Sequence, residues 1–158
     1  MASISELLRP EQIQLTLRGG DKSSVLRELV ELAPELRDEP AQREVFLNSL
    51  LEREKLHTTA IGDGIALPHT RNPLGGLLKR SLIVFGRHAQ GIPFAALDNK
   101  PVQLFFLIAS TNLTEHLGVL ARISRVLRDA KLRNELISAA LPAQVISSIR
   151  ETEQRLVK

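Results

Sequence analysis

Hydrophobic and polar positions at the start of the chain predict two short elements. Ile4, Leu7 and Leu8 have the spacing of a single helical turn, which should end before Pro10. From residue 13 to residue 17 the apolar positions alternate with polar ones, which is typical of a strand with one buried face. The segment therefore predicts a turn of helix followed by a strand.

Two helices are predicted after the Gly19-Gly20 turn. Asp21 can cap the first, which should run to about Leu36 because its apolar residues recur every three or four positions. Pro40 suits the first turn of the second helix, which should run to Glu54. The positions that carry the two patterns are Val25, Leu26, Leu29, Val30 and Ala33, followed by Val45, Phe46, Leu50 and Leu51.

The helical pattern is lost in residues 57–69, which contain two glycines and a proline. We expect a loop there, then a short buried strand over residues 65–67, then a second loop. Residues 81–85 and 102–109 are apolar runs short enough to be buried strands. Asn99-Lys100-Pro101 is a plausible turn into the second of them.

Helical spacing returns in the last third of the chain. Residues 115–127 predict a helix, and two further short helices should lie before and after Pro142. Helices and strands are mixed along the chain, with neither an internal repeat nor a low-complexity linker. Residues 1–158 are therefore expected to form a single layered α/β domain, with a mixed, mostly buried β-sheet flanked by helices.

Composition supports an ordinary globular protein. A chain of 158 residues with 43% hydrophobic and 25% charged residues can bury a core of its own. The absence of cysteine excludes disulfides and thiolate metal sites. No signal-peptide pattern begins the sequence, and no stretch reaches the roughly 18–20 apolar residues that span a bilayer. We expect a cytoplasmic protein without membrane insertion.

The formal net charge is +3, and acidic residues lie among the basic ones along most of the chain. The main exception is the run Arg122, Arg125 and Arg128, spaced three apart on a predicted helix. A solvated helix face is the commoner reading of such a run. No phenylalanine stands beside it to stack bases, so a nucleic-acid partner is not expected, whereas an acidic patch on a partner protein stays open.

His69 is the residue with the clearest chemical potential. Pro68 has no N–H to donate, so strand pairing should end there and His69 should emerge with one edge of its ring facing solvent. With an unperturbed pKa of ~6.5, a histidine is largely neutral at cellular pH, and a neutral imidazole nitrogen can attack phosphorus. Taken alone, the same pattern also fits an ordinary surface histidine.

Cofactor and metal sites are not expected. The glycines Gly62 and Gly64 could form a phosphate-binding loop only if a helix began directly after them, and Pro68 does not allow one. A zinc site needs several ligands at fixed spacings. The four histidines do not show such spacing: His57, His69, His88 and His116.

A longer motif surrounds His69. Arg53-Glu54-Lys55 is followed by residues 58–69, which read Thr-Thr-Ala-Ile-Gly-Asp-Gly-Ile-Ala-Leu-Pro-His. This combination resembles the signature of fructose/mannitol-type enzyme IIA proteins of the phosphoenolpyruvate-dependent phosphotransferase system. The sequence departs from the pattern at Ala60, where glycine is usual, and at Thr70, where a small residue is common.

The resemblance extends over nearly the whole chain. Residues 4–11 are similar to the start of the stand-alone nitrogen-regulatory enzyme IIA branch. Residues 98–102 resemble the family's turn into its central strand. His116-Leu117, followed by Leu120-Ala121, resembles the helix that carries the family's second histidine.

The resemblance implies a role for three residues. His69 matches the histidine phosphorylated on Nε2, His116 the second active-site histidine, and Arg53 an arginine near the phosphoryl group. The residue types suit these roles, because a guanidinium offers a permanent charge and paired hydrogen-bond donors, and the start of a helix favours an anion. Without the resemblance, Arg53 could be a solvated helix end and His116 a packed residue.

The resemblance also implies a phosphotransferase component whose donor is HPr or its nitrogen-branch counterpart. In the regulatory reading, phosphorylation controls binding to targets such as potassium-transport or sensor-kinase proteins. In the alternative reading, the phosphoryl group passes to an enzyme IIB that serves sugar transport. A third possibility is a binding module that has lost phosphorylation, and the presence of His69, His116 and Arg53 together argues against it.

Overall fold

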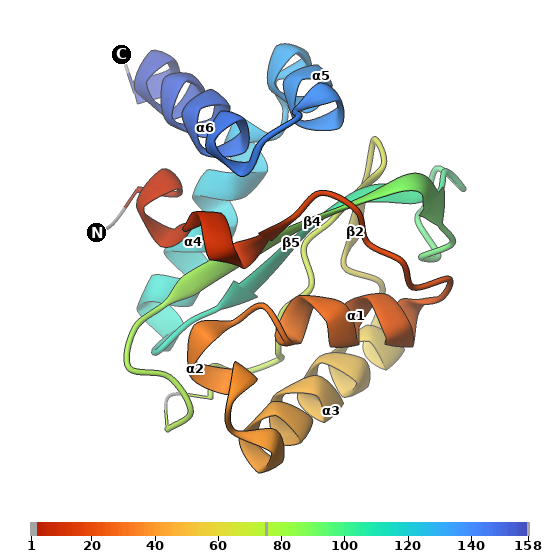
Figure 1. The fold of residues 1–158 in the computed structure, drawn as a ribbon, viewed down its shortest axis with the longest axis vertical. Coiled ribbons are helices and arrows are strands. Elements are labelled where there is room, and N and C mark those ends of the chain that lie inside the picture. Colours follow the sequence, from red (N-terminus) through yellow and green to blue (C-terminus); the bar gives the residue numbers. More distant parts are fainter. Residues whose placement is uncertain (1–2, 75, 158) are drawn as a thin grey trace.

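A five-stranded mixed sheet forms the centre of the computed structural model, which describes residues 3–74 and 76–157 (Figure 1). The strand order is β1-β4-β5-β3-β2. β4 and β5 pair antiparallel, β3 runs parallel to β5, and β2 pairs antiparallel with β3. The strands are β1 (Ile13–Gln14), β2 (Ala60–Gly62), β3 (Ile65–Ala66), β4 (Leu82–Ile92) and β5 (Val102–Ala109).

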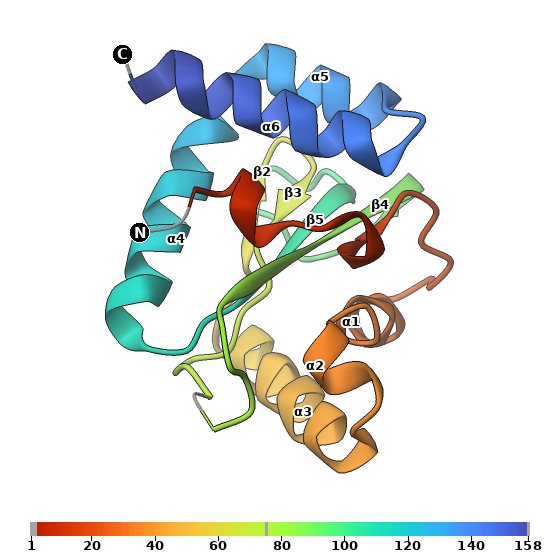
Figure 2. The same ribbon diagram turned by 60° about the vertical axis from the view of Figure 1, so that its left-hand side comes forward.

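Helices cover both faces of this sheet, as the sequence predicted (Figures 1 and 2). One face packs against α1 (Lys22–Val30), α2 (Pro34–Arg37) and α3 (Pro40–Leu56). The other packs against α4 (Leu113–Val126), α5 (Ala130–Ser138) and α6 (Pro142–Val157), together with the 3₁₀ turns η1 (Ser5–Leu7) and η2 (Pro10–Gln12). The architecture is a layered α/β fold.

The two central strands contribute side chains to both cores. Along β5, Leu104 and Phe106 point into the core beneath α4–α6, whereas Phe105 and Leu107 point into the core beneath α1–α3. Successive side chains of a strand face opposite sides, so a sheet covered twice needs an unbroken apolar run. The prediction of a buried strand over residues 102–109 is therefore confirmed at both ends.

The long helix predicted from Asp21 to Leu36 was wrong. Asp21 does cap α1, accepting a hydrogen bond from the backbone N–H of Ser24 at 2.8 Å, but the helix ends at Val30. Pro34 then begins the short helix α2, preceded by Ala33 in an extended conformation. Proline cannot continue a helix from the preceding turn, and it disfavours a helical residue before it.

Strand lengths also differ from the sequence prediction. β1 covers only the first two residues of the predicted alternation, although Leu17 still donates its N–H to the carbonyl of Arg87 at 2.8 Å. β4 continues past Phe85 to Ile92, because it stays paired with β5 while its outer residues become exposed. Hydrophobic patterns indicate which residues of a strand are buried. The pattern did not extend the predicted strand past Phe85 because this end of β4 is less buried.

Candidate functional site

Sheet topology brings the predicted site residues to one edge. β3 and β5 are parallel neighbours, so the residues that follow them emerge at the same edge of the sheet. His69 follows β3, and the start of α4 follows β5. The loop from α3 enters β2, which pairs with β3 and so places the end of α3 near the same edge. Residues far apart in the sequence are thereby gathered around His69.

The strand pairing around His69 differs from the prediction in one detail. Pairing was expected to end at Pro68, yet the carbonyl of Pro68 accepts a hydrogen bond from the N–H of Ile108 at 2.9 Å. His69 forms a bridge with the same residue of β5. Proline removes only a donor, and its carbonyl remains available for pairing. His69 is consequently held on the edge of the sheet and is half-buried.

The ring of His69 is fixed by its own backbone neighbour. Its Nδ1 lies 2.6 Å from the carbonyl oxygen of Leu67. A carbonyl can only accept a hydrogen bond, so Nδ1 carries the proton and Nε2 keeps its lone pair. This is the tautomer that a nucleophile at Nε2 requires.

Burial and the neighbouring groups shift the pKa of His69 in both directions. Burial lowers its pKa, and the positive charge of Arg53 does the same. The hydrogen bond to Leu67 and the negative charge of Glu54 raise it, but the net effect is a pKa below the usual value. The ring is therefore neutral, and Nε2 unprotonated, near neutral pH.

His116 lies beside His69, as the resemblance implied. The two ring centroids are 5.2 Å apart, with the ring planes tilted by 57°. His116 is buried, with 4% of its surface exposed, and its Nδ1 makes a hydrogen bond of 3.1 Å with the hydroxyl of Ser110. Burial, followed by the nearby charge of His69, lowers the pKa of His116 to about 4. It is a neutral polar group in the wall of the site.

The backbone around His116 explains its position. Asn112 caps α4 and accepts a hydrogen bond from the N–H of Glu115 at 2.9 Å, so His116 stands one turn inside the helix. Leu113 and Leu117 lie on the same helix and leave more than half of their side-chain surfaces exposed. The helix predicted over residues 115–127 is present but begins two residues earlier, at Leu113, and an apolar rim flanks the second histidine.

Arg53 stands in the last turn of α3 and is half-buried. Its guanidinium donates to the carbonyl of His57 at 2.6 Å, which fastens the loop that leaves the helix. Its charge is close enough to lower the pKa of His69. Arg53 therefore contributes positive charge to the His69 site. Its role with a phosphoryl group stays a prediction.

Sequence reasoning missed three residues that support the site. Glu54 and Thr59 belonged to the recognised motif but received no role, although both are buried and hydrogen-bonded to each other. Ser110 was also missed as the partner of His116. An acidic residue inside the motif was the available signal for Glu54, whereas the carbonyl of Leu67 has no side-chain signature.

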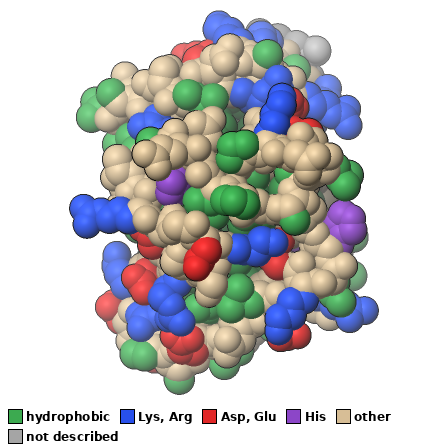
Figure 3. Space-filling model, turned by 90° about the vertical axis from the view of Figure 1, so that its right-hand side faces the viewer, with side chains coloured by type: hydrophobic (Ala, Val, Ile, Leu, Met, Phe, Trp, Pro, Cys, Tyr) green, Lys and Arg blue, Asp and Glu red, His purple; other side chains and the backbone are tan. Residues whose placement is uncertain are grey.

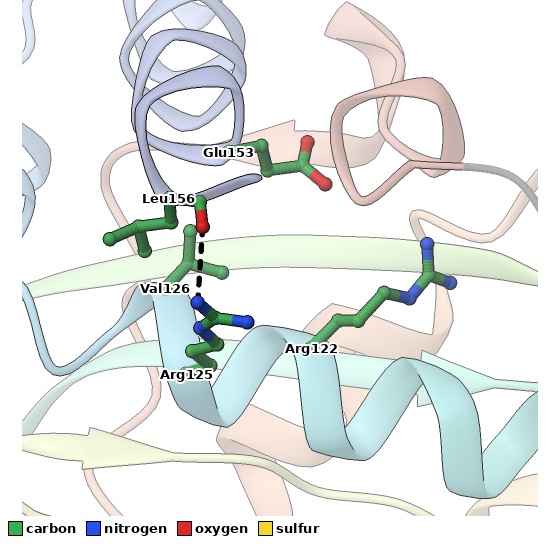
Figure 4. A pocket seen from close by; sticks show the side chains of 5 residues that line it. All are labelled: Arg122, Arg125, Val126, Glu153 and Leu156. Carbon is green, nitrogen blue, oxygen red and sulfur yellow. Dashed lines mark hydrogen bonds between the residues drawn. The ribbon is translucent and has the colours of Figure 1, made fainter. Parts of the chain in front are cut away.

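The arginine run on α4 makes internal contacts. Arg125 donates to the carbonyl of Leu156 near the end of α6 at 3.0 Å (Figure 4). Arg122 donates to the carbonyl of Gly118 in its own helix at 3.3 Å. These side chains line a small pocket of about 80 Å³ together with Glu153. Glu153 itself accepts the N–H groups of Ile4 and Ser5 at 2.7 and 2.9 Å, joining η1 to α6. Arg125 thus helps to join α4 to α6.

Charged groups elsewhere are interspersed. On the face shown in Figure 3, Lys and Arg side chains are mixed with Asp and Glu, and separate hydrophobic side chains lie between them. Within residues 3–74 and 76–157, no group of three or more His, Asp or Glu side chains could hold a metal ion. No helix of this described part is long and apolar enough to cross a membrane.

Comparison with known proteins identifies the class that this fold and site define. Residues 6–152 match the family described as the phosphoenolpyruvate-dependent sugar phosphotransferase system, EIIA 2, and the chain belongs to this family. A nitrogen regulatory protein from Bradyrhizobium diazoefficiens is 39% identical over 148 residues, covering 92% of this chain and 93% of its own length. Both the resemblance and the fold expected from the sequence are thus confirmed.

Two further similarities bear on the particular protein. The crystal structure of nitrogen regulatory protein IIA-Ntr from Neisseria meningitidis aligns with a TM-score of 0.80 at 30% identity, covering 92% of this chain and 98% of that one. The fructose-specific EIIABC component of Bacillus subtilis is 33% identical over 96% of this chain, which spans only 24% of that longer protein. Relatives thus carry both regulatory and sugar-transport names.

Proposed function

We propose that this chain is a phosphocarrier that accepts a phosphoryl group on Nε2 of His69 from an HPr-type protein and acts as a nitrogen-branch regulator through its phosphorylation state. The observation that carries the proposal is the hydrogen bond of 2.6 Å between His69 Nδ1 and the carbonyl of Leu67. It leaves Nε2 with a lone pair at the end of a rigid strand. The proposal places the protein in the cytoplasm.

The transfer needs little covalent machinery. The Nε2 lone pair of His69 forms a bond to phosphorus as the bond between phosphorus and the donor's imidazole nitrogen breaks, and the donor nitrogen keeps that electron pair. The His69 ring gains positive charge while Nδ1 retains its proton. The carbonyl of Leu67 stabilises this charge, because a hydrogen bond from a cationic donor is stronger than one from a neutral donor.

The remaining groups of the site suit the incoming phosphoryl oxygens. Arg53 supplies a permanent positive charge, and a guanidinium can donate two parallel hydrogen bonds to such a group. His116 stays neutral and can donate one hydrogen bond from its ring, with the other nitrogen held by Ser110. Both are proposed to stabilise the phosphoryl group without carrying it.

A regulatory role is favoured over sugar transport by the similarity to whole nitrogen regulatory proteins, which this chain covers almost from end to end. The alternative is a transport enzyme IIA that passes the phosphoryl group to an enzyme IIB, and the fructose-specific relative supports it. Regulated targets such as potassium-transport or sensor-kinase proteins belong to the first reading. Both readings share the same phosphorylated histidine.

Incubation of the full chain with phosphoenolpyruvate, enzyme I and either HPr type tests the proposal. Intact-mass measurement should show the gain of one phosphoryl group, with faster labelling by nitrogen-branch HPr. Adding an enzyme IIB then separates the two readings, since a transport protein would lose its label to IIB within the same assay. The absence of labelling with every donor would overturn the phosphocarrier proposal.

A further inference from the structure

Glu54 is a buried carboxylate next to the site, and its side chain is 3% exposed. It lies in the last turn of α3, and both of its oxygens have partners. Oε1 accepts the hydroxyl of Thr59, and Oε2 accepts the backbone N–H of Thr59 at 3.2 Å. Lys22 Nζ lies 3.3 Å from Oε2 and supplies the opposite charge. Removing a carboxylate from water is costly unless it is paired in this way.

A continuous chain of hydrogen bonds leads from this carboxylate to His69. The carbonyl of Thr59, whose N–H and hydroxyl are held by Glu54, accepts the N–H of Leu67 at 3.0 Å. The carbonyl of Leu67 then accepts the Nδ1 proton of His69 at 2.6 Å. Each link restrains the residue at which it acts, because the N–H and the carbonyl of one residue lie on the two planar peptide groups that meet at its Cα. The position of the carbonyl that selects the His69 tautomer thus depends on Thr59.

The segment that contains Thr59 is held from a second direction. The hydroxyl of Thr58 donates to the carbonyl of Phe94 at 2.6 Å. The ammonium group of Lys22 lies 4.4 Å from the centroid of the Phe94 ring, in addition to its ion pair with Glu54. Lys22 is thereby confined between a carboxylate and an aromatic face. Glu54 is the only charged partner in this set that contacts Thr59 directly.

We propose that Glu54 is a positioning residue for phosphoryl transfer: through Thr59 and Leu67 it holds the His69 ring in the tautomer that presents Nε2. The consequence for transfer rests on the proposed function of His69. The effect on the tautomer does not, because it is a property of the unphosphorylated protein. A carboxylate that served the fold alone would change stability and leave the tautomer of His69 as it is.

The substitution Glu54→Gln tests this proposal in the full-length protein. The amide keeps one acceptor oxygen, but it loses the charge and turns an NH₂ group toward either the Thr59 N–H or Lys22. Long-range ¹H–¹⁵N NMR of the imidazoles reads the tautomer of His69 directly. We expect loss of the single Nδ1–H form, and labelling by the phosphoryl donor slowed at least about tenfold, the effect of losing one hydrogen bond to a charged group.

A matched control lies on the same helix. Glu52→Gln makes the same chemical change at an exposed residue that pairs with Lys55 at 3.0 Å. It should leave both the tautomer and the labelling rate at wild-type values. Thr59→Val removes the hydroxyl and keeps the backbone groups, so it should have a smaller effect than Glu54→Gln. In a Glu54→Gln background its effect should shrink further, because the two residues act through one link.

Thermal unfolding, measured alongside, separates positioning from folding. A Glu54→Gln protein that is less stable but keeps the wild-type tautomer and labelling rate would overturn the proposal. If this variant does not fold, Thr59→Val decides by the same two readouts. If wild-type protein is not labelled by any donor, the proposed function fails, and the tautomer comparison still decides whether Glu54 positions the ring.

Discussion

His69 and His116 have ring centroids 5.2 Å apart, yet their surroundings give them different chemistry. His69 is half-buried and directs Nδ1 at a backbone carbonyl, which fixes the proton and leaves Nε2 as a nucleophile. His116 is buried and contacts a serine hydroxyl, which can donate or accept. The comparison teaches that two neighbouring histidines can differ in tautomer and in access to solvent, and the proposed function assigns the phosphoryl group to the one whose Nδ1 faces a carbonyl.

The largest expected effect comes from removing the half-buried ring of His69, the proposed nucleophile. His69→Ala should abolish phosphorylation while the fold remains, since the ring lies at the sheet edge outside the two hydrophobic cores. Intact-mass measurement after incubation with the donor system checks this. His88→Ala, a change near the opposite end of the central β4–β5 pair, is the control and should label like wild type. Labelling of the His69 variant would mean that another residue carries the group.

Removing the charge beside His69 should have the next largest effect. Arg53→Ala loses a charge-assisted contact worth about 1.5–3 kcal/mol, or roughly 10- to 150-fold in transfer rate if it is realised in the transition state. Arg53→Lys should recover only part of this, because an ammonium lacks the paired donors. Rapid-quench kinetics over a range of donor concentrations provides the test, with exposed Arg150→Ala as the control. Unchanged kinetics would mean that Arg53 only holds the loop after α3 in place.

Changes at His116 sharpen the comparison between the two rings. His116→Ala should still be phosphorylated at His69, but phosphohistidine lifetime or onward transfer should change by the equivalent of about 1.5–3 kcal/mol. His116→Gln should retain part of the wild-type behaviour, since its amide also donates. Time courses of label loss at fixed pH measure both variants. Lifetimes and transfer rates equal to wild type in both variants would show that His116 only fills space.

Both histidines should make the fold less stable as pH falls, because the pKa of each ring is lowered in the folded chain. Burial lowers the pKa of His116 to about 4 in the folded state, against a usual value near 6.5. Between these values the unfolded chain takes up a proton and the folded chain does not, so stability falls as pH falls from about 6.5 to about 4. The substitution His116→Gln removes the titrating ring, so it should remove up to about 3 kcal/mol of this pH-dependent loss of stability. Urea unfolding across that range checks it, and an undiminished pH dependence would contradict the buried neutral ring.

The smallest effect is expected at the cap that places His116. Asn112→Ala removes the acceptor of the Glu115 N–H and should cost about 0.5–2 kcal/mol of stability. Asn48→Ala, at an exposed position inside α3, is the matched control and should be neutral or slightly stabilising. Urea unfolding of both variants provides the comparison. Equal stabilities would mean that the cap contributes nothing to the start of α4.

Local patterns predicted much of this fold. The apolar run of β5 and the cap of α1 at Asp21 carry signals in neighbouring residues, so both could be located from the sequence. The hairpin between β2 and β3 could not, because its turn depends on positive φ angles at Gly62, Asp63 and Gly64, and its strands are short. Pro34 marks the helix break in the sequence, but the apolar repeat that continues past it led to the prediction of one long helix.

The sequence predicted the principal residues of the candidate site but not the groups that support them. His69, His116 and Arg53 came from a motif, and the structure places the two histidines side by side. The proposed roles of Glu54 and Thr59 depend on the hydrogen bond between the carbonyl of Thr59, in the loop after α3, and the N–H of Leu67, just after β3. No local sequence pattern predicts which carbonyl accepts the Nδ1 proton of His69. The tautomer of His69 could therefore be determined only from the folded structure.

The central claim is that Nε2 of His69 is the phosphoryl acceptor, and the position of the phosphoryl group on the protein tests it most directly. The labelled full chain should be mapped by peptide analysis that preserves phosphohistidine, and by long-range ¹H–¹⁵N NMR of its imidazoles. The account predicts one modified ring, that of His69, with phosphorus on Nε2 and the proton retained on Nδ1. A phosphoryl group on His116, or on Nδ1 of His69, would contradict it.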